Sequence, residues 1–175
     1  MRYWSIRIAL LVFLAASLAG QTNEWHTYRN VEGNFSALLP GEPAENVSTD
    51  ADGTTTHTVQ TVSDSVVFLV VFVSAPSEQP VNETTFNVYR DAFLKGLPKC
   101  DLVKEDAPSP AVTAHVGHWY RLNCTVEEKK FIFIGNLYWG KNRAYAVLSM
   151  YPEAPSDPPA ARKFINSFAV IDPDK

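Results

Sequence analysis

The segment from Ala114 to Val126 alternates, residue by residue, between a mostly apolar set and a more polar set. This alternation has the period of a β-strand, in which successive side chains point to opposite faces of a sheet. The sequence therefore predicts a strand with one face in a core. The side chains of the predicted core face are Ala114, Val116, His118, Tyr120, Leu122, Cys124 and Val126.

Five further segments have the composition of strands, and two have the pattern of helices. Residues 66–73 are apolar at every position, which predicts a central strand covered on both faces. Asn82 is a good N-cap for a helix over 83–95, and Asp157-Pro158 is a start signal for a helix over 157–168. The other strands are expected at 35–39, 54–62, 131–139 and 144–151.

The order of elements is strands, helix, strands, helix. Short turn-forming segments such as Asp52-Gly53 join many of the strands, and short connections give antiparallel hairpins. We expect an α+β fold in which an antiparallel sheet of about six strands is flanked by two main helices. The alternative is an all-β sandwich or barrel with peripheral helices.

Residues 1–19 have the order of a secretory signal peptide: a basic start, an apolar run at 8–16 and small residues at the end. The run is too short to span a bilayer stably. The end resembles a lipoprotein leader, but Gln21 follows Gly20 where an acylated cysteine would stand. We expect cleavage after Ala19 and a soluble periplasmic or extracellular chain, with residues 20–175 forming a single domain.

The balance of charge is acidic. Two of the 15 Lys and Arg residues lie in the leader, so 13 remain against 19 Asp and Glu residues. An acidic chain without a basic block is a poor partner for nucleic acid or anionic lipid, and no later apolar run reaches membrane length. The expected partner is an envelope or extracellular protein or a small ligand, and the chain itself is expected to be a monomer.

Cys100 and Cys124 are the only two cysteines of the chain. Two cysteines in an exported protein favour one disulfide, here joining the end of the first helix to the predicted 114–126 strand with α-carbons roughly 5.5 Å apart. The alternative is a pair of buried free thiols. No further ligands stand at a spacing that would make this pair a metal site.

Three short segments carry a family resemblance. The first has the aromatic residues Trp25 and Tyr28, then Gly-Asn-Phe-Ser at 33–36 and Pro-Gly-Glu-Pro at 40–43. The others are Gly-Lys-Asn-Arg-Ala-Tyr at 140–145 and Phe-Ile-Asn-Ser-Phe at 164–168. Together they resemble bacterial PsbP-like domains. The resemblance implies an α/β/α sandwich in proteins that are usually accessory or binding factors, and it carries over no manganese, calcium or chloride site.

Large aromatic residues and arginines near one hairpin are typical of a binding patch. The candidate binding residues are Trp119, Arg121, Trp139, Arg143 and Tyr145, unless the flanking helices cover them. His115 and His118 would point to opposite faces of a strand, so they cannot share a metal ion. The sequence contains no phosphate-binding loop, and no cofactor is expected. We expect a non-catalytic accessory or binding protein; the alternative is a small secreted hydrolase or ligand-processing enzyme with His118 in a pocket.

Overall fold

The computed structural model describes residues 24–74, 77–97, 99–108, 112 and 114–171. The predicted signal peptide and its cleavage site lie outside these residues. Ten strands and two helices are described, and all strand pairs are antiparallel. The seven strands of the large sheet are, in spatial order, β3 (Ala44–Thr49), β4 (Thr55–Ser63), β5 (Val66–Ser74), β9 (Arg143–Pro152), β8 (Lys129–Trp139), β7 (Val116–Val126) and β6 (Cys100–Asp106). The three strands of the small sheet are β1 (Trp25–Asn30), β2 (Phe35–Pro40) and β10 (Ala169–Val170).

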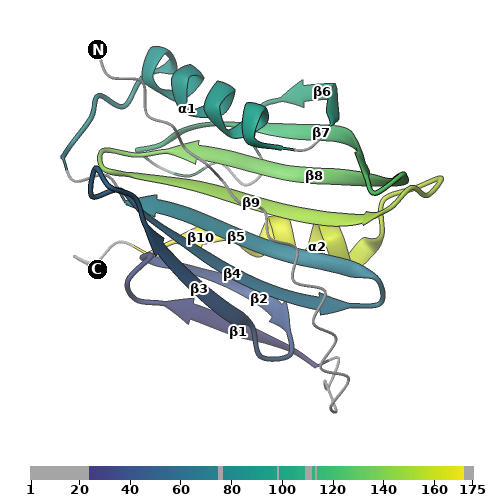
Figure 1. The fold of residues 1–175 in the computed structure, drawn as a ribbon. Helices are drawn as coiled ribbons and strands as arrows, with labels where there is room; N and C mark the ends of the chain where they lie inside the picture. Colours follow the sequence, from purple (N-terminus) through teal and green to yellow (C-terminus); the bar gives the residue numbers. More distant parts are fainter. Residues whose placement is uncertain (1–23, 75–76, 98, 109–111, 113, 172–175) are drawn as a thin grey trace.

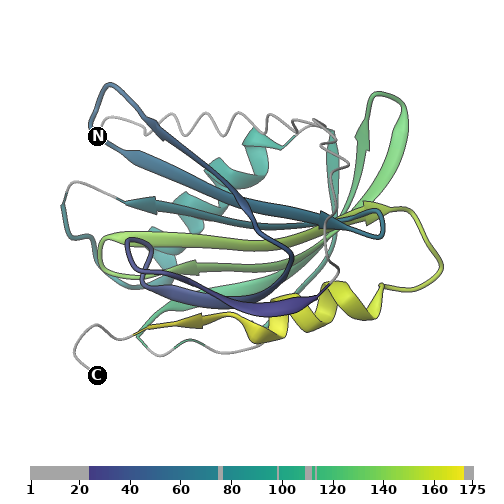
Figure 2. The ribbon, with the colours of Figure 1, turned by 90° about the horizontal axis from the view of Figure 1, so that it is seen from below.

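The elements form layers on the two faces of the large sheet (Figures 1 and 2). Helix α1 (Glu83–Gly96) covers one face, which we call the α1 face. Helix α2 (Pro159–Ser167) and the small sheet cover the other, which we call the α2 face. Each face has its own apolar core, because the central strands are buried on both sides.

Local sequence explains α1 well. The Asn82 side chain accepts a hydrogen bond from the Thr85 backbone N–H at 2.9 Å, which satisfies one of the free donors at the helix start. Phe86, Tyr89 and Phe93 recur at helical spacing and are buried against the large sheet. Their partners on β7 include Tyr120 and Leu122, so the predicted core face of this strand is confirmed at its centre.

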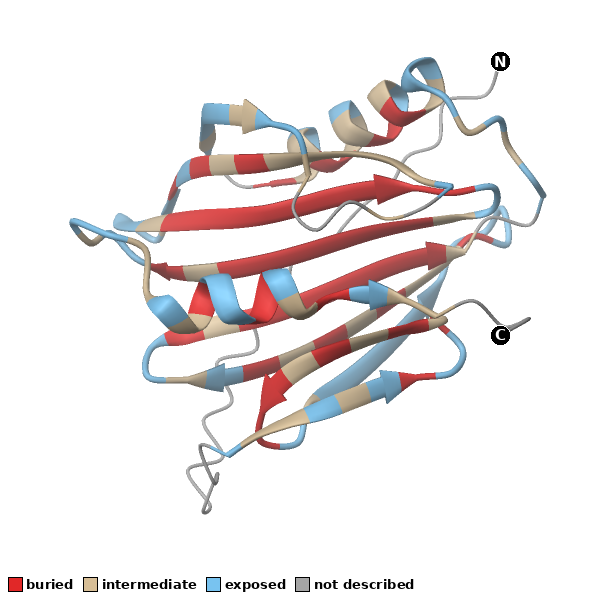
Figure 3. Ribbon diagram, turned by 180° about the vertical axis from the view of Figure 1, so that it is seen from behind, coloured by how far each residue is buried: buried red, intermediate tan, exposed pale blue. Residues whose placement is uncertain are grey.

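The prediction of an α+β fold with antiparallel strands and two helices is confirmed, but the strand count differs. A sheet of about six strands was expected, and the structure has seven strands in one sheet and three in another. The predicted strands are mostly interior; β3 and β6, which the prediction missed, are the two edges of the large sheet. Figure 3 shows why: the central strands β5, β9 and β8 are mostly buried, whereas β3 and β6 are mostly exposed and lack a buried stripe.

The predicted disulfide is present, but it joins different elements from those expected. Cys100 belongs to β6 and lies directly opposite Cys124 of β7, with the α-carbons 4.1 Å apart. This is close to the separation of a non-hydrogen-bonded pair in an antiparallel ladder. The bond therefore ties an edge strand to its neighbour rather than the end of α1 to the sheet.

Helix α2 also begins later than predicted. Its first residue is Pro159, and Pro158 occupies the N-cap position without a side-chain hydrogen bond to the helix. The Asp157 side chain, expected as the cap, instead accepts hydrogen bonds from three side chains that are described below.

Candidate functional site

Strand β7 carries polar residues to both faces of the large sheet near its exposed edge. His118 and Tyr120 point to the α1 face, while Trp119 and Arg121 point to the α2 face. Each pair lies beside a carboxylate from another element. Two polar clusters result, one on each face of the same strand.

The Glu105 cluster lies on the α1 face and consists of Glu83, Arg90, Glu105, His118 and Tyr120. Glu105 Oε1 on β6 accepts a hydrogen bond from the Tyr120 hydroxyl at 2.9 Å and lies 2.6 Å from His118 Nδ1. From α1, Arg90 approaches the same carboxylate at 3.6 Å, and Glu83 lies 3.5 Å from His118 Nε2. The cluster therefore connects α1, β6 and β7 through one carboxylate.

Solvent reaches this cluster. The side chains of His118 and Glu105 are 30% and 27% exposed. Burial, followed by the hydrogen bond to Glu105, raises the pKa of Tyr120, so its hydroxyl stays protonated and donates. Phe86 of α1 packs against the His118 ring, with ring centroids 5.0 Å apart, and fixes the plane of the imidazole.

The Asp157 cluster lies on the α2 face and consists of Arg121, Tyr151, Asp157 and Arg162. Asp157 Oδ1 accepts hydrogen bonds from Arg121 of β7 and from the Tyr151 hydroxyl of β9. Asp157 Oδ2 accepts one from Arg162 of α2 at 2.7 Å. The Asp157 side chain is only 6% exposed, so this carboxylate holds the start of α2 against the sheet.

Burial alone would raise the pKa of Asp157. The hydrogen bonds from Tyr151 and Arg121, together with the positive charges of Arg121 and Arg162, outweigh burial and hold the pKa below its usual value. The same contact raises the pKa of Arg121. The cluster is thus a closed structural contact in which the Asp157 carboxylate is ionised.

The five predicted binding residues do not form one surface. Trp119 and Arg121 are half-buried neighbours on the α2 face of β7, and the Lys104 amine of β6 lies 5.8 Å from the centre of the Trp119 ring. Trp139 is buried on the α1 face, where its indole N–H donates to the Pro80 carbonyl at 3.0 Å. The structure therefore separates Trp139 from the pair on β7.

The remaining two predicted residues lie at the start of β9. Tyr145 is buried on the α2 face, and its hydroxyl donates to the Gly33 carbonyl at 2.8 Å. Arg143 is half-buried, with its guanidinium 5.9 Å from the centre of the Phe72 ring. Of the predicted set, Trp119, Arg121 and Arg143 remain partly accessible to a partner.

Sequence analysis missed Lys104 and Glu105 because β6 was not predicted as a strand. Their side chains reach the two faces of the sheet through the register in which Lys104 lies opposite Arg121 and Glu105 lies opposite Tyr120. The sequence did contain one signal for this strand. Cys100 was expected to bond to Cys124 on a predicted strand, and the apolar pair Leu102-Val103 follows it, as a neighbouring strand would have.

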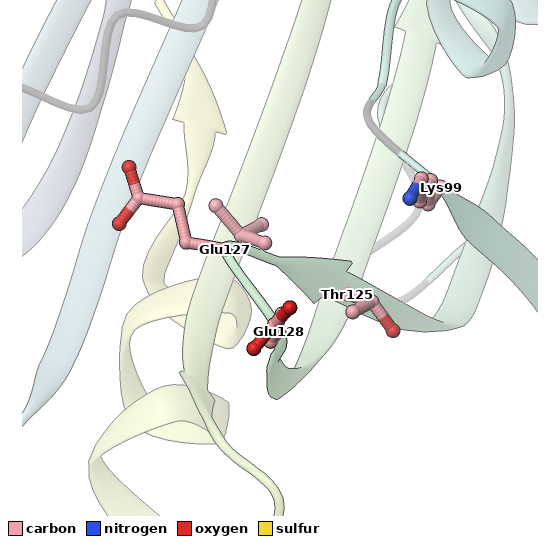
Figure 4. A pocket seen from close by; sticks show the side chains of 5 residues that line it. Lys99, Thr125, Glu127 and Glu128 are labelled. Carbon is pink, nitrogen blue, oxygen red and sulfur yellow. The ribbon is translucent and has the colours of Figure 1, made fainter.

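A hollow of about 330 Å³ lies at the β7–β8 turn, lined by Lys99, Thr125, Val126, Glu127 and Glu128 (Figure 4). His118 is seven residues from Thr125 along an extended strand, a span of about 23 Å. The hollow therefore does not join His118 to a nucleophile. Among the described residues, the recorded side-chain contacts of His118 are with Glu83, Glu105, Phe86 and Tyr120.

Within the described ranges, no group of three or more His, Cys, Asp or Glu side chains is arranged to hold a metal ion. A search of the same residues finds no helix that is long and apolar enough to cross a membrane.

No protein-family model matches the chain, and no curated protein matches it. The solved structures that are similar to it include two from bacteria. One, from Bacteroides thetaiotaomicron, is 13% identical with a TM-score of 0.42, and the match covers 89% of this chain and 51% of that one, so this chain spans about half of that protein. The other, the protein of unknown function PA94 from Pseudomonas aeruginosa, is 10% identical with a TM-score of 0.40, over 74% of this chain and 83% of that one.

Proposed function

We propose that this protein is an exported, non-catalytic accessory or binding domain of the PsbP-like type, with the α/β/α sandwich that this family has. The observation that carries the proposal is the meeting of the three segments that resemble the family. Although they are far apart in the sequence, they pack in one place on the α2 face.

Aromatic rings make this contact. Phe35 from the first segment, Tyr145 from the second and Phe168 from the third lie with ring centroids 5.5 to 6.3 Å apart. Two hydrogen bonds extend it: the Tyr145 hydroxyl donates to the Gly33 carbonyl, and the Leu38 backbone N–H donates to the Ser167 hydroxyl at 2.8 Å. The short motifs thus have a shared structural reason to occur together, which supports the proposal.

Export is supported by the disulfide, since disulfides persist in oxidising compartments. A binding role is supported by the surface around Trp119, where a half-buried indole lies beside Lys104 and Arg121. Arg121 is already held by Asp157, so a partner that contacts this surface would meet a preorganised side chain.

The competing hypothesis of a hydrolase rests on one specific observation. His118 Nδ1 is held by the Glu105 carboxylate, which is how a general base is often oriented. The recorded contacts of the imidazole are two carboxylates and two aromatic side chains, and none of these is an activated nucleophile of the serine or cysteine type. We therefore favour binding.

The test places a benzophenone amino acid at position 119, where it replaces one aromatic side chain with another, in cells that export the native protein. A matched control carries the same group at Val88, an exposed position on α1. We expect one envelope or extracellular protein to be captured from position 119 and not from position 88. Binding of that purified protein should then weaken on Trp119→Ala and be unchanged by His118→Gln.

The hydrolase hypothesis predicts the opposite pattern. Turnover of a panel of ester and amide substrates would be abolished by His118→Gln and unaffected by Trp119→Ala. That result, or the absence of a specific adduct at position 119, would contradict the proposed function.

A further inference from the structure

His118 lies between two carboxylates that belong to different elements. Its Nδ1 is 2.6 Å from Glu105 Oε1 of β6, and its Nε2 is 3.5 Å from Glu83 Oε2 of α1. We propose that protonation of His118 clamps the start of α1 and the end of β6 onto β7, and that loss of the proton releases both segments. This His118 clamp goes beyond the proposed function and does not depend on it, because the proposed binding surface lies on the opposite face of the sheet.

The number of protons on the imidazole decides how many of these contacts can form. A neutral imidazole has one N–H, so it donates to one carboxylate and turns a lone pair toward the other. An imidazolium ion has an N–H on each ring nitrogen and donates in both directions. Because Glu105 and Glu83 are both acceptors, both contacts are favourable at the same time only when His118 is protonated.

The surrounding charges favour the protonated ring. Among the described residues, the titratable groups that face this site come from three elements: Glu83, Arg90 and Asp91 of α1, Glu105 of β6 and Tyr120 of β7. On β8 the residue opposite His118 is Leu137, which carries no charge. Since Tyr120 is neutral, three carboxylates face one guanidinium, and a proton on His118 lowers the net charge of the set from −2 to −1.

The two segments that the clamp holds have few other attachments. A β-bulge after Leu102 interrupts the ladder between β6 and β7, and only three residue pairs follow it. Of the β6 residues in these three pairs, Glu105 alone is not exposed. In the first turn of α1, Glu83 is 62% exposed, and the buried contacts of the helix begin at Phe86. Each segment can therefore open locally while the core beneath it stays folded.

The direction of the pH effect follows from these contacts. An imidazole changes charge between about pH 5 and pH 8, so the clamp is complete at the acid end of this range and weakens as the pH rises through it. In stronger acid, below about pH 4, carboxylates take up protons and the contacts are lost again. The start of α1 and the end of β6 are therefore held most firmly in mild acid.

Hydrogen–deuterium exchange of the oxidised protein at about pH 5.5 and about pH 8 tests the clamp, with rates corrected for the intrinsic effect of pH. In peptides covering residues 83–87 and 100–106, we expect protection to fall by about fivefold between the two pH values, as for a partly exposed contact between charged groups. Peptides from α2 are the internal control. The low pKa of Asp157 keeps it ionised over this range, so protection there should not change.

Variants then assign the effect to the imidazole. His118→Gln keeps a hydrogen-bond donor but cannot gain a charge, so the difference between the two pH values should vanish in both segments. Glu83→Gln, at an exposed position, should remove it from the start of α1 and leave it in β6.

His57→Gln is the matched control. His57 lies on β4, and its Nε2 is 3.4 Å from a carboxylate of a different turn, that of Glu32, so the pH effect in α1 and β6 should remain. Circular dichroism should show that every variant is folded. Equal protection at both pH values in the native protein, or a pH effect that survives His118→Gln or is lost in His57→Gln, would overturn the proposal, whatever the outcome of the crosslinking at position 119.

Discussion

Asp157 and Glu105 contact successive residues of β7 from opposite faces of the sheet, and the two carboxylates have much in common. Each accepts a hydrogen bond from a tyrosine hydroxyl, Tyr151 or Tyr120, and each has an arginine from the helix on its face within 4 Å. They differ in exposure, since the side chain of Asp157 is 6% exposed and that of Glu105 is 27% exposed.

This difference separates a buried structural contact from one that solvent reaches. The buried carboxylate must keep its partners, because an unpaired buried charge costs several kcal/mol. The half-exposed carboxylate has water as an alternative partner, so its contacts with Arg90 and His118 contribute less to stability and remain open to competition.

The largest effect is expected from reducing the disulfide. Cys100 and Cys124 are 24 residues apart in sequence, and opening a loop of this size should lower the free energy of unfolding by about 3 kcal/mol. Urea unfolding of oxidised and reduced protein measures the loss. Hydrogen exchange should speed up in β6, which carries Glu105, and stay unchanged at the start of α2. Cysteines that label freely in the native, non-reduced protein would contradict the disulfide itself.

Asp157→Ala should lower the free energy of unfolding by about 2 kcal/mol, because Arg121 and Tyr151 both lose their acceptor in a poorly hydrated site. Arg162→Ala is the control. Its side chain is 62% exposed, so removing it should cost no more than about 0.5 kcal/mol. Equal losses for the two variants would show that the cluster is not closed as described.

The contribution of Asp157 should also depend on pH. Its pKa in the folded protein lies below the usual value of about 4, so the ionised group stabilises the fold above that value. This stabilisation is lost as the pH falls through the lower, folded-state pKa. The difference in unfolding free energy between the native protein and Asp157→Asn should therefore be largest at neutral pH and shrink in acid. A difference that stays constant down to strong acid would argue against the ionised state.

Glu105→Gln should have the smallest effect, about 1 kcal/mol or less, since the amide oxygen still accepts from Tyr120 and water replaces the remaining contacts. Added salt should narrow the difference from the native protein, because the lost term is a screened surface interaction. A loss as large as that of Asp157→Ala would remove the distinction between the two clusters.

The interior of the fold could be predicted from sequence because a buried face requires apolar residues at a regular spacing. The apolar run at 66–73 became β5, which lies inside the large sheet, and the Asn82 cap fixed the start of α1. The edge strands β3 and β6 have no such apolar pattern. In β3 every residue is exposed, and in β6 most are, so neither face selects apolar side chains.

The candidate site was predicted only in part, for a related reason. Alternation along β7 placed Trp119 and Arg121 together, but it carried no information on what the neighbouring strand would bring beside them. Trp139 and Tyr145 resemble binding residues by type, yet each fills a core and uses its polar atom to satisfy a backbone carbonyl. Residue type alone does not distinguish these uses.

The order of strands in the large sheet has a consequence for how the chain matures. Strands β3 to β5 form one local meander and β6 to β9 another, and within the described part of the chain the only ladder that joins them is β5 with β9. Synthesis proceeds from the N-terminus, so the first meander emerges while its most apolar strand still lacks one neighbour. That strand has the composition of an aggregation-prone segment until residues 143–152 arrive. The pairing of β5 with β9 is therefore the step at which a nascent chain of this protein is most exposed to misassembly. A delay in completing the second meander would leave β5 without this neighbour for longer.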